Sequence, residues 1–488
     1  MFRYARTDAV AGIVVFLVAL PLCLGIAIAC GVPPVSGLLA GVIGGVVIPF
    51  FSRAALSVSG PAAGLTSVVL LGIRDLGGLA PFFVAVAIAG VMQLGFGIFR
   101  MGRYSSVVPS AVIKGMLAAI GITIVMKQIG PALGSTLPAM QAFGDVHLGS
   151  AVIAAVSLVL LYTLPMTPLR KLKWLSPAFV TVAMGVVLAE VFSAAMPSWA
   201  LSPAELISLP TGGPVALFEA LPKLDWSSVS RTEVWVLAIT IAFVASIETL
   251  LSVQAVDRLD PMGRKSPLDR ELVAQGIANT ASGLLGGLPV TSVIVRSGAN
   301  VAAGGRERFA SVVHGALLAI AVMAFAGLLN RIPISCLAAV LIQVGLNLFR
   351  PSLVREQWKL GLPQFVPFAM TIAAILATDL LKGVVIGVLL GVVIMVYDNA
   401  KGAIESMTAD GRAVLKFRRD GTFVGKPFLI AALEKIPEGG RVLIDATGEF
   451  LDYDTREVLA NFVKDAPRQK IDVEVKGVSL DGISGSGH

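Results

Sequence analysis

Long apolar stretches, separated by short polar turns, fill most of the first 400 residues. Most are 16 to 24 residues long, enough for a helix to cross a bilayer, and two are shorter. The pattern predicts about fourteen membrane segments, near 9–30, 34–51, 61–73, 81–99, 109–127, 149–164, 175–196, 232–255, 270–286, 291–303, 309–329, 332–349, 364–380 and 382–398.

The two short segments both follow a helix-breaking sequence. Gly60-Pro61 interrupts LSVSGPAAGLTSVV, and Gly-Gly-Leu-Pro ending at Pro289 opens GGLPVTSVIVRSGANVAAGGR. Proline lacks an amide hydrogen and clashes with the preceding turn, so each site predicts an extended piece and then a half-length helix, the second beginning near Thr291 or Ser292. Paired interruptions of this kind are typical of a transporter's binding site, whereas simple kinks in full-length helices are the alternative.

Basic residues test the segment count, because cytoplasmic loops of membrane proteins are enriched in Lys and Arg. If the first segment enters from the cytoplasm, fifteen loop Lys and Arg residues lie inside and six outside. The inside set is Arg53, Arg100, Arg103, Arg170, Lys171, Lys173, Arg258, Arg264, Lys265, Arg270, Arg306, Arg308, Arg350, Arg355 and Lys359. The asymmetry favours an even number of segments with both termini cytoplasmic.

A polar connector at 197–231 divides the fourteen segments into seven and seven. The interrupted segment is the third in each half. An odd number of crossings reverses the orientation of the second half, which predicts an inverted repeat covering about 8–196 and 232–400 within a membrane domain of residues 1–400.

Composition supports a membrane protein. The chain is 56% apolar and 14% charged, with mean hydropathy +0.85. Its net charge of +7 comes from basic residues in the loops between apolar segments, where they report membrane topology, and we expect no nucleic-acid partner. The three cysteines lie inside apolar runs and His147 and His314 are isolated, so neither disulfides nor a zinc site are expected. Because no nucleophile elbow or phosphate-binding loop occurs, we expect neither an enzyme nor an ATP-driven pump.

After about residue 400 the sequence has the character of a soluble domain. Strand patterns in AVLKF, RVLIDAT and KIDVEV alternate with helical patterns in FLIAALEKI and TREVLANFVKD. They predict a small cytoplasmic α/β domain over 401–480, followed by a flexible tail at 481–488.

The two half-helices suggest anion binding, because helix N-termini offer unsatisfied amides and the positive ends of helix dipoles. The surrounding residues are small and mostly neutral, so backbone amides and hydroxyls are the expected ligands. These residues are Ser57, Ser59, Ala62, Ala63, Thr66, Thr291 and Ser292.

Two charged residues lie inside predicted membrane segments, where they are not expected to be solvated. Arg296 lies inside the second half-helix and would either raise the potential at the anion site or form a structural pair. Glu248 lies in the eighth segment, and Ser252 follows four residues later on the same helical face. Glu248 would carry a proton or, with Ser252, bind Na⁺; a structural Glu248–Arg296 pair is the alternative. We interpret Asp379 as an interfacial cap.

The start of the ninth segment, SPLDRELVAQGIAN, follows a basic loop. Asp269, Arg270 and Glu271 are therefore predicted to form a solvated helix start at the cytoplasmic face.

Several of these motifs together resemble the SulP family of anion transporters: LSVSGPAAGLT, IETLLS, LDRELVAQGIAN and GGLPVTSVIVRSGANVAAGGR. The resemblance covers about residues 5 to 400. It implies core and gate domains moving as an elevator, with substrate held at Gly60, Ala63 and Thr66 and at Thr291, Ser292 and Val293. It also matches the family's acidic position to Glu248 and its basic position to Arg296. The C-terminal module is similar to a short STAS domain, for which the resemblance implies a docking or dimer-stabilising role.

Within the family, the chain looks most like bacterial members associated with bicarbonate uptake. The expected function is secondary active transport of bicarbonate, coupled to Na⁺ or H⁺, by a homodimer in a bacterial inner membrane; no other cofactor is expected. Sulphate permease and anion exchanger are alternatives. A passive channel would leave Glu248 without a coupling role, and an anion sensor would bind without transporting.

Overall fold

The computed structural model describes residues 4–103, 109–137, 139–168, 176–213, 216, 219, 223–409 and 412–480. The chain forms two compact units, one of Met1–Arg355 with Met370–Val384 and one of Glu356–Ala369 with Val385–His488. The predicted tail at 481–488 lies outside the described residues.

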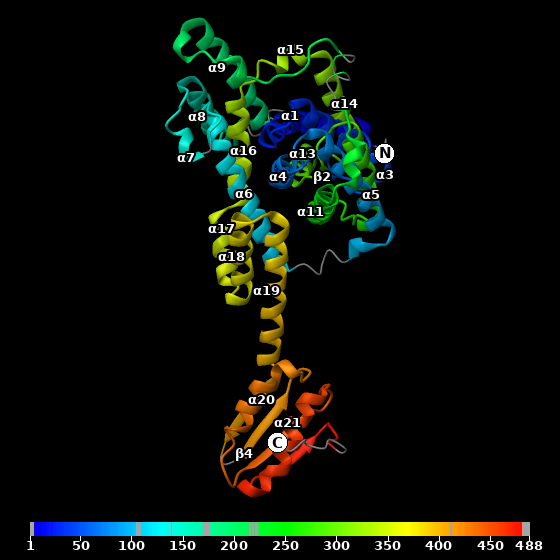
Figure 1. Cartoon of the computed structure of the whole chain (residues 1–488), viewed down its shortest axis with the longest axis vertical. Helices are drawn as coiled ribbons and strands as arrows, with labels where there is room; N and C mark the ends of the chain where they lie inside the picture. Colours follow the sequence, from blue (N-terminus) through cyan, green and yellow to red (C-terminus); the bar gives the residue numbers. More distant parts are fainter. Residues whose placement is uncertain are drawn as a thin grey trace. The chain divides into compact units, whose positions relative to one another are not determined.

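Helices dominate the first unit (Figure 1). Those before the connector are α1 (Ala5–Ala29), α2 (Pro34–Val46), α3 (Ile48–Phe51), α4 (Thr66–Leu76), α5 (Leu79–Ile98), α6 (Ser110–Ala132), α7 (Ala139–Ala142), α8 (Leu148–Thr163) and α9 (Pro177–Ala195). Those after it are α11 (Thr232–Asp257), α12 (Leu268–Leu284), α13 (Ile294–Ala303), α14 (Phe309–Ala324), α15 (Ala326–Leu329), α16 (Ile334–Leu348), α17 (Pro351–Lys359), α18 (Leu362–Ala377) and α19 (Leu380–Lys401), the last three continuing into the second unit.

Each of the fourteen predicted stretches overlaps at least one of these helices, and the stretches 34–51 and 309–329 each contain two. Within the described residues, nine helical stretches are both long and apolar enough to cross a membrane. The short helix α17 was not predicted, because its sequence, PSLVREQWK, is polar and reads as a loop. The multi-pass membrane architecture predicted from the hydropathy pattern is therefore confirmed, while the count of fourteen crossings stays a prediction.

Local sequence explains where the two half-length helices end. Helix α4 stops at Gly77 and α13 stops at Gly304, with φ values of 77° and 93°. This left-handed conformation is favourable for glycine and closes the last turn by hydrogen bonds to the preceding carbonyls. The two segments thus share a proline break before the helix and a glycine stop after it.

Several pairs of helices in the first unit pack closely. Helix α12 packs along α5, α1 against α14, and α11 against α5. Helices α6 and α8 pack against α16, α8 packs against α9, and α1 also contacts α9 and α16. A continuous apolar core includes Leu38, Ile153 and Leu337, which come from α2, α8 and α16. Both α4 and α13 contact α1 and α11, and Figure 1 shows them among these helices.

The second unit contains a four-stranded sheet in the order β3-β4-β5-β6. Its elements are β3 (Ile404–Ala409), β4 (Arg412–Phe417), α20 (Lys426–Leu433), β5 (Arg441–Asp445), α21 (Tyr453–Asp465) and β6 (Asp472–Lys476). The pairs β4–β5 and β5–β6 are parallel and β3–β4 is antiparallel. All the elements predicted in this domain occur. Edge strand β3 was missed, because IESMTA is too polar to show a buried face.

Candidate functional site

The two proline-interrupted segments meet as a pair of short strands. Strand β1 (Ser59–Pro61) runs antiparallel to β2 (Val290–Ser292), and all six residues are buried. Gly60 lies opposite Thr291, and Ser59 lies opposite Ser292. Segments separated by more than 200 residues therefore cross at one point, as the paired breaks in the sequence predicted.

The half-helices begin later than predicted. A short 3₁₀ turn, Ala63–Leu65, precedes α4, and α13 begins at Ile294 rather than near Thr291 or Ser292. The reason is that β-branched Val290, Thr291 and Val293 favour an extended backbone and gain strand pairing there. Thr291 and Ser292 are consequently strand residues, and Val293 occupies the position before the helix.

Some predicted donors already have partners within the protein. The Ser292 amide donates to Thr249 Oγ1 at 3.2 Å, and the Val293 amide donates to the Val58 carbonyl at 3.0 Å. The Thr66 hydroxyl donates to the Ala63 carbonyl at 2.7 Å. The Thr291 hydroxyl, by contrast, is buried and has no hydrogen-bond partner among the described residues.

Arg296 is the third residue of α13 and its side chain is 0% exposed. The buried Cys23 thiol lies beside the guanidinium, but none of the three guanidinium nitrogens has a partner with hydrogen-bond geometry among the described residues. The guanidinium lies over β1, since a Cβ built on Gly60 would stand 1.8 Å from Nη1. Only glycine at position 60 leaves room for this charge. A buried cation without a counter-charge is strongly unfavourable, so the geometry suits an anion beside Arg296.

Glu248 belongs to α11, and its carboxylate lies beside the turn that leads into the other half-helix, α4. The Gly64 amide donates to its carboxylate, and a Cβ on Gly64 would stand 2.8 Å from Oε2. Oε2 is buried and has no partner in the described part of the chain. Ser252 is buried one turn further along α11. Since Arg296 is itself unpartnered, a hydrogen-bonded Glu248–Arg296 pair does not form.

A buried polar face of α12 holds β1. Glu271 accepts a hydrogen bond from the Ser52 hydroxyl and, at 3.0 Å, one from Gln275. Gln275 also donates to the Ser59 hydroxyl of β1 at 2.9 Å. Glu271 is only 1% exposed, so the prediction that it belongs to a solvated helix start is wrong. The carboxylate is stable there because it accepts several hydrogen bonds from groups buried with it.

The same face of α12 holds β2. Asn279 accepts from the Val290 amide at 2.6 Å and donates to the Val290 carbonyl at 2.9 Å. The Ser282 hydroxyl donates to the Leu288 carbonyl at 2.6 Å. Sequence reasoning overlooked this face. Its signal was the helical spacing of polar residues, at 271, 275, 279 and 282, along an otherwise apolar segment.

The crossing of two broken segments inside an apolar helical bundle, with a buried cation on one and a carboxylate beside the other, defines a membrane transport protein for small ions. The chain belongs to the sulfate permease family, whose model matches residues 6–371. It is therefore a multi-pass integral membrane protein of an anion transporter family and not an enzyme.

Individual relatives agree with this assignment. The chain is 29% identical over 398 residues to the putative sulfate transporter YvdB of Bacillus subtilis, covering 78% of this chain and 72% of that one. It is 26% identical over 406 residues to the bicarbonate transporter BicA of Picosynechococcus sp., covering 79% and 69%. The structure of the murine Slc26a9 anion transporter superposes with TM-score 0.76 at 16% identity, covering 100% of this chain and 88% of that one, which shows a shared fold.

Proposed function

We propose that this chain is a secondary active transporter of a small inorganic anion, with bicarbonate as the favoured substrate. The anion binds where β1 and β2 cross, between the starts of α4 and α13. The observation that carries the proposal is the buried, unpartnered guanidinium of Arg296 over Gly60. The binding residues are Gly60, Ala63, Thr66, Thr291, Ser292, Val293 and Arg296.

The choice of anion follows from charge and from the relatives. A site with one guanidinium, Arg296, and one carboxylate, Glu248, suits a monovalent anion better than a divalent one. BicA, a relative at 26% identity, is named a bicarbonate transporter. Sulphate is the second candidate, because YvdB, at 29% identity, is named a putative sulfate transporter.

Coupling is proposed to run through Glu248. Because the Gly64 amide donates to this carboxylate, a proton or Na⁺ arriving at Glu248 changes the 3₁₀ turn that leads into α4. The same turn contains Ala63, one of the proposed anion-binding residues. The coupling ion and the anion would therefore share one structural element, which is the requirement for thermodynamic coupling between two sites. Ser252 supplies a hydroxyl for Na⁺.

The proposed architecture has fourteen crossings in two inverted repeats of seven, with both termini cytoplasmic in a bacterial inner membrane. The helices around the site form a core domain, which moves as an elevator past a gate domain. Residues 401–480 form a cytoplasmic STAS-like domain, consistent with its parallel strands and crossover helices. The assembly is a homodimer.

Uptake into proteoliposomes tests the proposal. Labelled bicarbonate and labelled sulphate are offered separately, while the Na⁺ gradient and the pH gradient are varied one at a time. We expect bicarbonate to accumulate above its external concentration when one gradient is imposed. Flux that only equalises the two compartments would indicate a passive channel. Binding without any flux would indicate a sensor. Accumulation of sulphate alone would show that sulphate, and not bicarbonate, is the substrate.

A further inference from the structure

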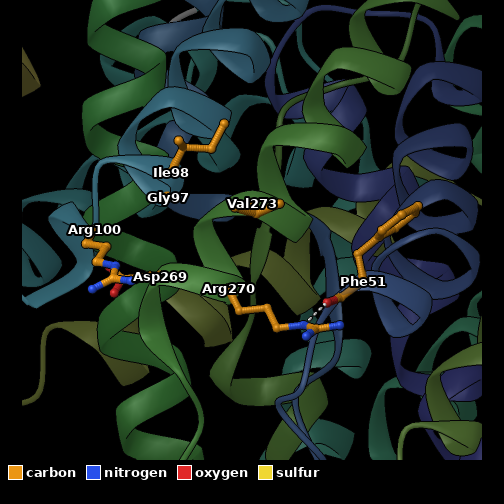
Figure 2. A pocket seen from close by; sticks show the side chains of 7 residues that line it. All are labelled: Phe51, Gly97, Ile98, Arg100, Asp269, Arg270 and Val273. Carbon is orange, nitrogen blue, oxygen red and sulfur yellow. Dashed lines mark hydrogen bonds between the residues drawn. The ribbon is translucent and has the colours of Figure 1, made fainter.

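A surface pocket lies where three helices of the first unit end or begin, away from the crossing strands. Its volume is about 360 Å³, and it is bounded by the end of α3, the end of α5 and the first turns of α12. Figure 2 shows the side chains that line it, with Arg100 and Arg270 reaching it from different segments. The pocket combines two guanidinium groups with the apolar side chains of Phe51, Ile98 and Val273.

A hydrogen bond within the protein holds Arg270 in place. Arg270 donates from Nε to the Phe51 carbonyl at 2.9 Å, which leaves its two terminal nitrogens for another acceptor (Figure 2). Arg100 follows α5 with φ of 58°, a left-handed conformation that is uncommon for a residue with a side chain. The acid at the pocket, Asp269, accepts from the Gly102 amide at 2.8 Å. In Figure 2 the Arg100 guanidinium lies beside Asp269 and Arg270 extends toward Phe51, so among the residues that line the pocket two positive charges stand against one carboxylate.

The surroundings of the pocket are apolar and exposed. Ile98, the last residue of α5, is 69% exposed, and Phe99, which follows it, is 77% exposed. Helix α5 is 20 residues long and apolar enough to cross the membrane, so its end lies near the level of the lipid headgroups. At that depth an apolar rim contacts acyl chains and arginines reach the phosphates.

We propose that this pocket binds an anionic phospholipid, with the terminal nitrogens of Arg270 on its phosphate, with Arg100 adding positive charge at the same pocket, and with an acyl chain against Ile98 and Phe99. Guanidinium groups bind phosphate oxygens through pairs of parallel hydrogen bonds, which suits the free terminal nitrogens of Arg270. A soluble anion would use the two charges but would gain nothing from the apolar rim. A zwitterionic lipid would fill the rim but would leave the pocket with excess positive charge.

Native mass spectrometry on the full-length protein tests this site. The purified chain is exchanged into mixed micelles containing equal amounts of phosphatidylcholine and phosphatidylglycerol, and the lipids retained per protein are counted. We expect the unmodified chain to retain phosphatidylglycerol preferentially. Replacing both arginines (R100Q with R270Q) should lower that preference roughly tenfold or more, since each basic residue near the membrane surface contributes attraction to anionic lipid.

The matched control is R53Q with R258Q, which removes the same charge from exposed positions outside the pocket and should keep the preference. A second variant, R100K with R270K, keeps the charge but loses paired hydrogen bonding, so it should show an intermediate preference. Gel filtration checks folding, and the lysine variant carries the test if the glutamine variant aggregates. Equal retention of both lipids by the unmodified chain, equal loss in the control, or displacement of the lipid by inorganic phosphate would overturn the proposal.

Discussion

The two broken segments have similar backbones and opposite chemistry. Each contains a proline break, a three-residue strand and a half-length helix closed by glycine. The first presents Gly64 to the carboxylate of Glu248, whereas the second carries the guanidinium of Arg296, which lies over Gly60 of the first. The comparison teaches that backbone symmetry builds the crossing, while the charges differ, and the proposed function assigns cation coupling to Glu248 and anion binding to Arg296.

Gly60→Ala should have the largest effect, because the added Cβ would stand 1.8 Å from Arg296 Nη1. The buried guanidinium would have to move, at a cost of several kcal/mol, and we expect uptake to fall about 100-fold. Uptake into proteoliposomes measures the change. Gly298→Ala is the matched control. Gly298 lies in α13, the half-helix that carries Arg296, and a Cβ there meets nothing within 4 Å. Equal uptake by G60A and the unmodified chain would contradict the placement of Arg296.

Arg296→Ala asks whether the second segment carries the anion-binding charge. Hydrogen bonds to a charged group contribute about 1.5–3 kcal/mol, so we expect the Kd for the anion to rise roughly 10- to 100-fold. Isothermal titration with bicarbonate and with sulphate measures it. The double variant with G60A sharpens the comparison: once the guanidinium is gone, the alanine at position 60 should cost little more. Additive losses would show that Gly60 acts independently of Arg296.

Glu248→Gln asks whether the carboxylate beside the first segment carries the coupling. The amide keeps an acceptor for the Gly64 amide but cannot take up a proton or neutralise Na⁺. We expect accumulation driven by the cation gradient to disappear, while the Kd for the anion changes by less than about threefold, because Arg296 is untouched. Counterflow exchange and equilibrium binding separate the two quantities. Unchanged dependence on the gradient would remove Glu248 from the coupling role.

The sequence predicted the two crossing segments better than the residues of α12 that hold them in place. Proline breaks and small residues are local signals, so Gly60, Glu248 and Arg296 could be singled out before any coordinates. The start of α13 was misplaced because strand pairing with residues more than 200 positions away decides it. Glu271 was misjudged for a similar reason: its burial depends on Ser52 and on packing against α5, and a charged triplet after a basic loop looks like a solvated helix start.

The smallest effects should come from the side chains of α12 that hold the two strands, and they compare the strands directly. Asn279 makes two hydrogen bonds to the backbone of β2, whereas Gln275 makes one to a side chain of β1. Asn279→Ala leaves a buried amide and carbonyl without partners and should lower stability by about 1–3 kcal/mol.

Gln275→Ala takes one hydrogen bond each from the Ser59 and Glu271 side chains, while Glu271 keeps the Ser52 donor and no backbone group loses a partner, so its loss should lie nearer 1 kcal/mol. Thermal unfolding of the purified protein measures both variants, with Thr280→Ala on the same helix as the control, since its hydroxyl bonds only to the Gly276 carbonyl one turn earlier. A larger fall in Tm for Q275A than for N279A would mean that β1, not β2, is the strand that α12 fixes. The guanidinium of Arg296 would then depend on the first segment for its position as well as for the space that Gly60 leaves.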